Sequence, residues 1–214
     1  MCDHGLQTQC ETTQVREEGR GAALFGFSKL YGAVAGGQAE YLRIPQAGYG
    51  PIKLPAGPAD DRFLFLSDVL PTAWQSVQYA GVPDGGTLAI LGLGPIGEMA
   101  ARVAQHLGYR VIAVDLVPER IERARSHAVE VLDWNEVDDL PGAIRELTDG
   151  RGPDSVIDAV GMEAHGSPVA DVVHKATGLL PRKVGEKLMK TAGIDHLAAL
   201  HAAIDIVRAA ARSR

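Results

Sequence analysis

At Gly92-Leu93-Gly94-Pro95-Ile96-Gly97 the sequence carries a G-x-G-x-x-G motif. The motif follows an apolar run, residues 87–91, and leads into apolar residues at helical spacing over residues 96–107. A second apolar run, residues 111–114, ends at Asp115. This order of strand, glycine turn, helix, strand and acidic residue is typical of proteins that hold a dinucleotide.

The glycines and the acidic residue each have a physical role in such a site. Gly92 permits a tight turn, Gly94 lets a pyrophosphate approach the backbone, and Gly97 lets the helix pack against the first strand. The start of the helix then offers unpaired N–H groups and a partial positive charge to the phosphates. A carboxylate at Asp115 accepts hydrogen bonds from ribose hydroxyls and repels a 2′-phosphate, which favours NAD over NADP.

The motif is open to interpretations other than NAD binding. The glycines could shape a turn only, with Asp115 merely ending a strand. Flavin-binding proteins place the motif at the extreme N-terminus and usually end the second strand with Glu. Methyltransferases carry a related glycine loop after an acidic residue, which is absent before Gly92.

The composition indicates a globular protein without a nucleic-acid or membrane role. The chain has 214 residues, 46% of them hydrophobic, and a formal net charge of -6. A nucleic-acid-binding chain would normally show a basic excess. Neither a signal peptide nor an apolar run of about 18–20 residues is apparent in the sequence. We therefore expect a cytoplasmic protein of one large or two small domains.

Strands and helices are predicted to alternate over residues 85–161. Such alternation means parallel pairing with right-handed crossovers. The fold class is therefore α/β, a Rossmann-type doubly wound sheet of order 3-2-1-4 that lacks its last strands. The predicted strands are residues 88–91, 111–114, 130–132 and 155–160, and the predicted helices cover residues 96–107 and 140–147, with a shorter one from Pro118.

The regions on either side have a different character. Residues 1–21 are predicted to be irregular, and residues 22–57 to contain a strand at 38–45 with short extended pieces at 24–27 and 52–54. After this incomplete all-β unit, Pro71 opens a helix whose apolar residues, Ala73, Trp74, Val77 and Ala80, have helical spacing. Residues 162–214 are predicted to be mostly helical.

Four motifs together resemble the zinc-containing medium-chain alcohol dehydrogenases, and among them the glutathione-independent formaldehyde dehydrogenase branch. They are Cys2 with Cys10-Glu11-Thr12-Thr13, residues 36–45, residues 66–72, and the glycine loop with Asp115. The resemblance implies a partial GroES-like catalytic domain at residues 1–68. It also implies a partial NAD-binding Rossmann domain at residues 69–214, with a helical insertion at residues 162–195.

The resemblance also implies roles for single residues. Cys2 and Cys10 match the third and fourth ligands of a C-x2-C-x2-C-x7-C structural zinc lobe. Asp68 matches a ligand of the catalytic zinc, and Thr72 a catalytic-site residue beside the nicotinamide. The residues expected to bind the cofactor are Gly92, Gly94, Pro95, Ile96, Gly97, Asp115, Arg120, Val160 and Gly161.

The implied reaction is hydride transfer from a small alcohol or aldehyde hydrate to NAD, with zinc polarising the substrate oxygen. The sequence lacks counterparts of the other catalytic zinc ligands, half of the structural zinc lobe and the interface strands of the family homo-oligomer. It therefore looks truncated at both ends, and we expect it to be inactive alone. The alternatives are a non-catalytic dinucleotide-binding remnant and an interaction role for the basic helical face near residues 182–190.

Overall fold

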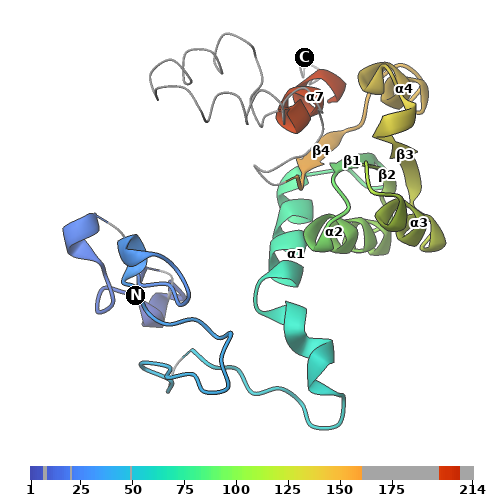
Figure 1. Cartoon of the computed structure of the whole chain (residues 1–214). Helices are drawn as coiled ribbons and strands as arrows, with labels where there is room; N and C mark the ends of the chain where they lie inside the picture. Colours follow the sequence, from blue (N-terminus) through green and yellow to red (C-terminus); the bar gives the residue numbers. More distant parts are fainter. Residues whose placement is uncertain (7–8, 20, 49, 161–197, 208–214) are drawn as a thin grey trace, which may run out of the picture. The chain divides into compact units, whose positions relative to one another are not determined.

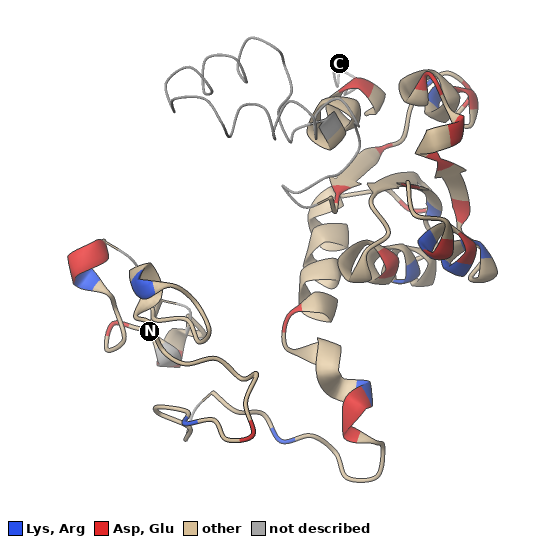
Figure 2. Ribbon diagram, in the orientation of Figure 1, with Lys and Arg blue, Asp and Glu red and all other residues tan. Residues whose placement is uncertain are grey.

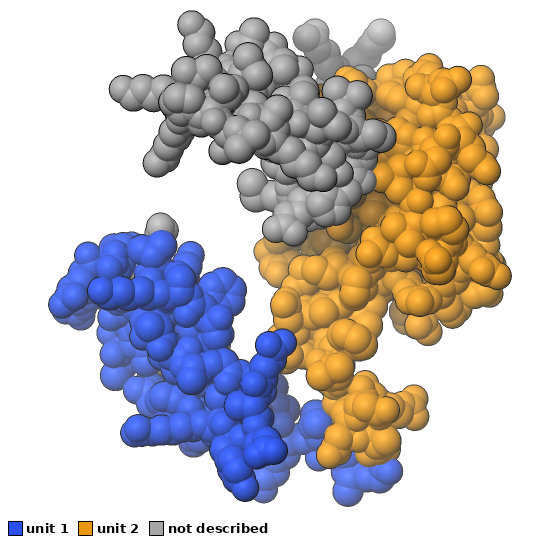
Figure 3. Space-filling view, viewed as in Figure 1, with its two compact units in different colours: residues 1–57 blue, residues 58–214 orange. Residues whose placement is uncertain are grey.

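A computed structural model describes residues 1–6, 9–19, 21–48, 50–160 and 198–207 (Figure 1). The chain divides into two compact units, Met1–Gly57 and Pro58–Arg214 (Figure 3). The division falls in a stretch rich in proline and glycine, as is usual for a linker. A functional boundary after residue 68 stays a prediction, and the helical insertion predicted at residues 162–195 lies outside the described residues.

The second unit is built on a parallel four-stranded sheet. Its order is β3-β2-β1-β4, which confirms the predicted order. β1 pairs with β2 on one side and β4 on the other, so the direction of winding reverses at β1. The strands are β1 (Thr87–Leu91), β2 (Arg110–Asp115), β3 (Glu130–Asp133) and β4 (Ser155–Asp158), the last ending two residues earlier than predicted.

Helices cover both faces of this sheet, because successive side chains of a strand point to opposite faces (Figure 1). In β1, Leu88 and Ile90 are buried in the cluster that includes α1, α2 and α3, whereas Ala89 and Leu91 are buried in the cluster that includes α4 and α7. The central strands are therefore apolar on both faces. The helices are α1 (Val69–Ala80), α2 (Pro95–His106), α3 (Pro118–Ser126), α4 (Leu140–Glu146) and α7 (Ala198–Ile206), with short 3-10 turns η5 (Asp60–Leu66) and η6 (Trp134–Glu136).

Local sequence signals explain where several of these helices begin and end. Pro95 and Pro118 lie in the first turns of α2 and α3, where a missing N–H costs no intrahelical hydrogen bond. α1 ends at Gly81, which takes the left-handed conformation with φ 58°. Among the described residues, no helix is long and apolar enough to cross a membrane.

The first unit is irregular. It contains the 3-10 turns η1 (Cys2–His4), η3 (Arg16–Glu18) and η4 (Lys29–Tyr31), and isolated bridges join Gln14 to Ala22 and Phe25 to Val34. The prediction of a strand at residues 38–45 was wrong. Of the two short extended pieces, residues 24–27 contain the bridged Phe25, and residues 52–54 have no assigned secondary structure. The alternating pattern was present, but no segment in the described part of this unit pairs with it, and unpaired strands are unstable in water.

Candidate dinucleotide-binding site

The glycine turn lies at the carboxyl end of β1, where the winding of the sheet reverses. Open α/β sheets bind ligands at this position. Gly92 has φ 90°, and a β-carbon there would lie 3.0 Å from Val160 Cγ2 and 3.1 Å from the Ala159 carbonyl oxygen. Both the backbone conformation and the close approach of the chain after β4 therefore require glycine.

The other two glycines have contrasting surroundings. A β-carbon on Gly97 would lie 1.9 Å from the Gly92 carbonyl oxygen, so α2 packs directly on the turn. Gly94, just before α2, has an extended backbone, and a β-carbon there would meet nothing within 4 Å. The turn is thus closed on the protein side at Gly97 and open at Gly94, which leaves room for a ligand against the helix start.

The start of α2 is suited to an anion. Its first N–H groups have no acceptor within the helix, and the helix dipole places partial positive charge there. Pro95 occupies the first turn, and Ile96 is half-buried against the core on the α1 side. Val160 is half-buried against the opposite core, while Gly161 lies outside the described residues.

Asp115 ends β2 and is buried, with 7% of its surface exposed. Its Oδ2 accepts a hydrogen bond from the Leu93 amide at 2.5 Å. Its Oδ1 accepts hydrogen bonds from the amides of Leu116 at 2.7 Å and Val117 at 2.8 Å. Arg120 Nη1 lies 3.7 Å from Oδ2, so a guanidinium faces the same carboxylate.

Residues of both charges surround this carboxylate. In Figure 2, basic and acidic residues share α3, which carries Arg120. Asp133, the last residue of β3, is paired in register with Asp115 across the sheet. The carboxyl end of the sheet beside β2 therefore carries two neighbouring carboxylates, and Arg120 is the cation that contacts Asp115.

Asp68 and Thr72 lie together at the start of α1. The Thr72 hydroxyl donates a hydrogen bond to Asp68 Oδ1 at 2.8 Å, and both residues are exposed. Asp68 occupies the position before the helix without a side-chain bond to a backbone N–H. Its carboxylate instead accepts the hydrogen bond from Thr72. The catalytic roles that the resemblance implies for these two residues stay predictions.

The described residues do not provide a zinc site. No three side chains of His, Cys, Asp or Glu lie close enough together in this part of the chain to hold a metal ion. Cys10 is a free, half-buried thiol. Hydrogen bonds lower the pKa of this thiol, and the one with the Thr13 side chain has the largest effect. The side chain of Cys2 lies outside the described part, so the two zinc assignments stay predictions.

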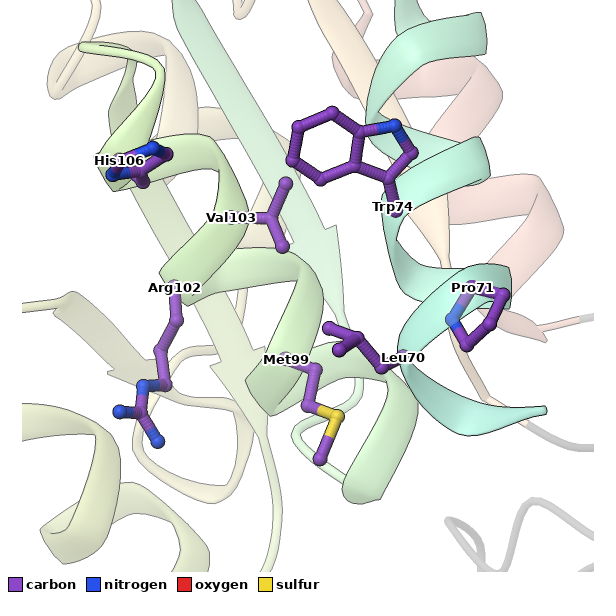
Figure 4. Close-up of a pocket in the computed structure, with 7 residues that line it drawn as sticks. All are labelled: Leu70, Pro71, Trp74, Met99, Arg102, Val103 and His106. Atoms are coloured by element: carbon purple, nitrogen blue, oxygen red, sulfur yellow. The ribbon is translucent and has the colours of Figure 1, made fainter. Parts of the chain in front are cut away.

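An apolar groove that the sequence did not reveal lies between α1 and α2 (Figure 4). Trp74, one of the apolar residues at helical spacing in α1, is 47% exposed. Ala73 and Val77 are one helical turn apart and face the core, whereas Trp74 is turned away from them. The groove has a volume of about 540 Å³, and the glycine turn is not part of its lining. It is lined by Leu70, Pro71, Trp74, Met99, Arg102, Val103 and His106.

Known proteins share this fold. Residues 95–179 match the family model described as "Zinc-binding dehydrogenase". A zinc-type alcohol dehydrogenase-like protein of Schizosaccharomyces pombe is 41% identical over 187 residues, covering 84% of this chain and 44% of that protein. The chain belongs to the zinc-type alcohol dehydrogenase family.

Two further proteins extend the comparison. A glutathione-independent formaldehyde dehydrogenase of Pseudomonas aeruginosa is 37% identical over 152 residues, covering 69% of this chain and 38% of that protein. The solved alcohol dehydrogenase TADH from Thermus sp. ATN1 is similar with a TM-score of 0.66 and 29% identity, covering 87% of this chain and 45% of that chain. This member of the family thus spans less than half the length of these relatives.

Sequence reasoning missed the backbone groups of the site. The amides of Leu93, Leu116 and Val117 all donate to Asp115. Each non-proline residue carries the same amide, so side-chain patterns cannot show which amides converge. The sequence signal for these amides was indirect. A carboxylate predicted at the buried end of a strand needs hydrogen-bond donors, and backbone amides are the donors nearby.

Proposed function

We propose that the chain binds NAD at the glycine turn through residues 92–97 and Asp115. Two observations together carry this proposal: a β-carbon on Gly97 would lie 1.9 Å from the Gly92 carbonyl oxygen, and the buried Asp115 carboxylate lies beside the turn. The phosphates lie against the first N–H groups of α2, and the Asp115 carboxylate accepts from the adenosine ribose. Bound NAD supplies a hydride acceptor.

The same residues favour NAD over NADP. The 2′-phosphate of NADP carries a charge of about −2. It would lie close to Asp115 and to Asp133, which is paired with Asp115 on the neighbouring strand. Arg120 contacts the Asp115 carboxylate and compensates only part of this charge. The hydroxyl of NAD can instead donate to the carboxylate without repulsion.

Calorimetric titration with NAD and NADP tests the binding proposal. NAD should bind more tightly than NADP, and the gap should narrow in Asp115→Ser because the repelling charge is removed. Asp133→Asn is a useful second variant because it removes the neighbouring carboxylate alone. Absence of heat at millimolar NAD with the folded protein would rule the proposal out.

We propose that the chain takes part in the oxidation of a small alcohol or aldehyde hydrate. We also propose that the chain by itself does not catalyse this reaction. The family and the names of its relatives support the reaction class. The second part is supported by Asp68, which belongs to no group of three potential metal ligands among the described residues. A carboxylate by itself holds zinc weakly against water. Formation of NADH from ethanol or formaldehyde by the purified chain, with its zinc content measured in parallel, would contradict it.

An alternative is a dinucleotide-binding protein without catalysis. It is favoured by the contrast between the well-formed glycine turn and the missing ligand cluster among the described residues. NAD binding without NADH formation, even after zinc and the catalytic portion of a longer relative are added, would support this alternative. NADH formation restored by the longer relative's catalytic portion would support a role in dehydrogenation.

A further inference from the structure

The Asp115 carboxylate joins two loops at the carboxyl end of the sheet. Through Oδ2 it holds the amide of Leu93, which lies within the glycine turn after β1. Through Oδ1 it holds the amides of Leu116 and Val117, which lead from β2 into α3. A single side chain thus connects the turn that faces the start of α2 with the segment that leads to Arg120.

This arrangement uses most of what the carboxylate offers. An ionised carboxylate has about four acceptor sites, and the three amides occupy three of them. Hydrogen bonds to a charged acceptor are stronger than neutral ones, and burial of Asp115 shields them from water. The turn is consequently held in place before any ligand arrives.

We propose that Asp115 is a positioning residue for the glycine turn. It fixes the Leu93 amide, and with it the backbone between Gly92 and Gly94 that faces the phosphates. This role rests on the proposed dinucleotide site, and it is separate from a contact between the carboxylate and the ribose. A preformed turn binds phosphate without first having to order its own backbone.

Asp133 provides a matched control. It ends β3 as Asp115 ends β2, and the two residues are paired in register. Its Oδ1 accepts hydrogen bonds from the backbone and side-chain nitrogens of Asn135, at 2.8 Å and 3.0 Å. Asp133→Asn therefore removes a neighbouring carboxylate whose hydrogen bonds go to Asn135 rather than to Leu93.

Amide hydrogen exchange of the protein without cofactor tests the positioning role. In Asp115→Asn, exchange at Leu93 should accelerate about tenfold or more, because a bond to a charged acceptor is lost. The amides of β1 should keep their rates, and Asp133→Asn should leave Leu93 unchanged. Unchanged exchange at Leu93, or equal acceleration throughout the sheet, would overturn the proposal.

A second variant guards against misfolding of Asp115→Asn. In Asp115→Ser the short hydroxyl can still accept from the amide two residues ahead, Val117, but cannot reach Leu93. Exchange should then rise at Leu93 while Val117 stays protected. Equal loss of protection at both amides would show that Asp115 does not act on the turn specifically.

Binding of nicotinamide mononucleotide separates positioning from ribose contact. This probe has a phosphate but no adenosine ribose, so a residue that acts only through that ribose leaves its affinity unchanged. We expect Asp115→Asn to weaken its binding about threefold or more, because a loosened turn orients its amides poorly. Unchanged affinity would overturn the positioning role. Lack of binding to the unmodified protein would count against the proposed function instead, and the exchange measurement would still decide the positioning role.

Discussion

The two units contain similar β-forming residues, but these residues form paired, buried strands only in the second unit. In the first unit Tyr41 and Ile52 are 91% and 88% exposed, and the segment around Tyr41 forms no strand. In the second unit Leu88 and Ile90 are 0% exposed and lie in a strand paired on both sides. A β-forming sequence thus becomes a strand where a second segment completes its hydrogen bonds, and the alternation of strands and helices supplies that segment nearby.

The largest effect should come from shortening a core side chain in the second unit. Ile90→Ala should lower the free energy of unfolding by about 2–5 kcal/mol, because it opens a cavity in the centre of the sheet. The matched change Ile52→Ala in the first unit should cost less than about 0.5 kcal/mol. Urea denaturation followed by circular dichroism measures both variants, and the fluorescence of Trp74 and Trp134 isolates the second unit. Equal losses would break the contrast between the units.

A smaller effect is expected from a single added methyl group in the glycine turn. Gly97→Ala should lower the free energy of unfolding by about 1–3 kcal/mol, because its β-carbon collides with the Gly92 carbonyl oxygen. Gly94→Ala should keep the stability, since that position is open, yet weaken NAD binding by filling the ligand's space. Thermal denaturation and calorimetric titration of both variants check this. Equal destabilisation by the two changes would refute the assignment of a closed and an open side.

A still smaller effect is expected at the edge of the sheet. Arg110 donates to both carboxylate oxygens of Glu130 on the neighbouring strand and to the Leu147 carbonyl oxygen. Because both charged side chains are about two-fifths exposed, Arg110→Gln should cost only about 0.5–1 kcal/mol, and less at high salt. A double-mutant cycle with Glu130→Gln isolates the pair. A coupling independent of salt would argue against an exposed ion pair.

The smallest effect concerns local chemistry in the first unit. Hydrogen bonding by Thr13 lowers the pKa of the Cys10 thiol, so more of it is thiolate at neutral pH. Thr13→Val should raise that pKa and slow alkylation by iodoacetamide about two- to fivefold, whereas Thr13→Ser should not. The rates are measured in a Cys2→Ser background so that one thiol reacts. Unchanged reactivity in Thr13→Val would show that the first unit lacks this local order.

Much of the site could be predicted because its signals are local. The glycine turn, the helix after it and Asp115 follow one another within a single β-α-β unit, where the spacing of residues determines their neighbours. Trp74 shows the limit of such reasoning. Trp74 belongs to the same helical pattern as the buried Ala73 and Val77, yet it is exposed. Successive residues of a helix point about 100° apart, so Trp74 points away from its neighbour Ala73.

By itself, the sequence determined the order of strands and helices, the strand order across the sheet and the positions of the glycines. These follow from periodicity and from backbone conformations that only glycine adopts easily. Only the tertiary structure decided that residues 38–45 form no strand and that the Leu93 amide bonds to Asp115. The reason is physical. Periodicity acts between near neighbours in the chain, whereas strand partners and buried hydrogen bonds depend on which distant segments meet.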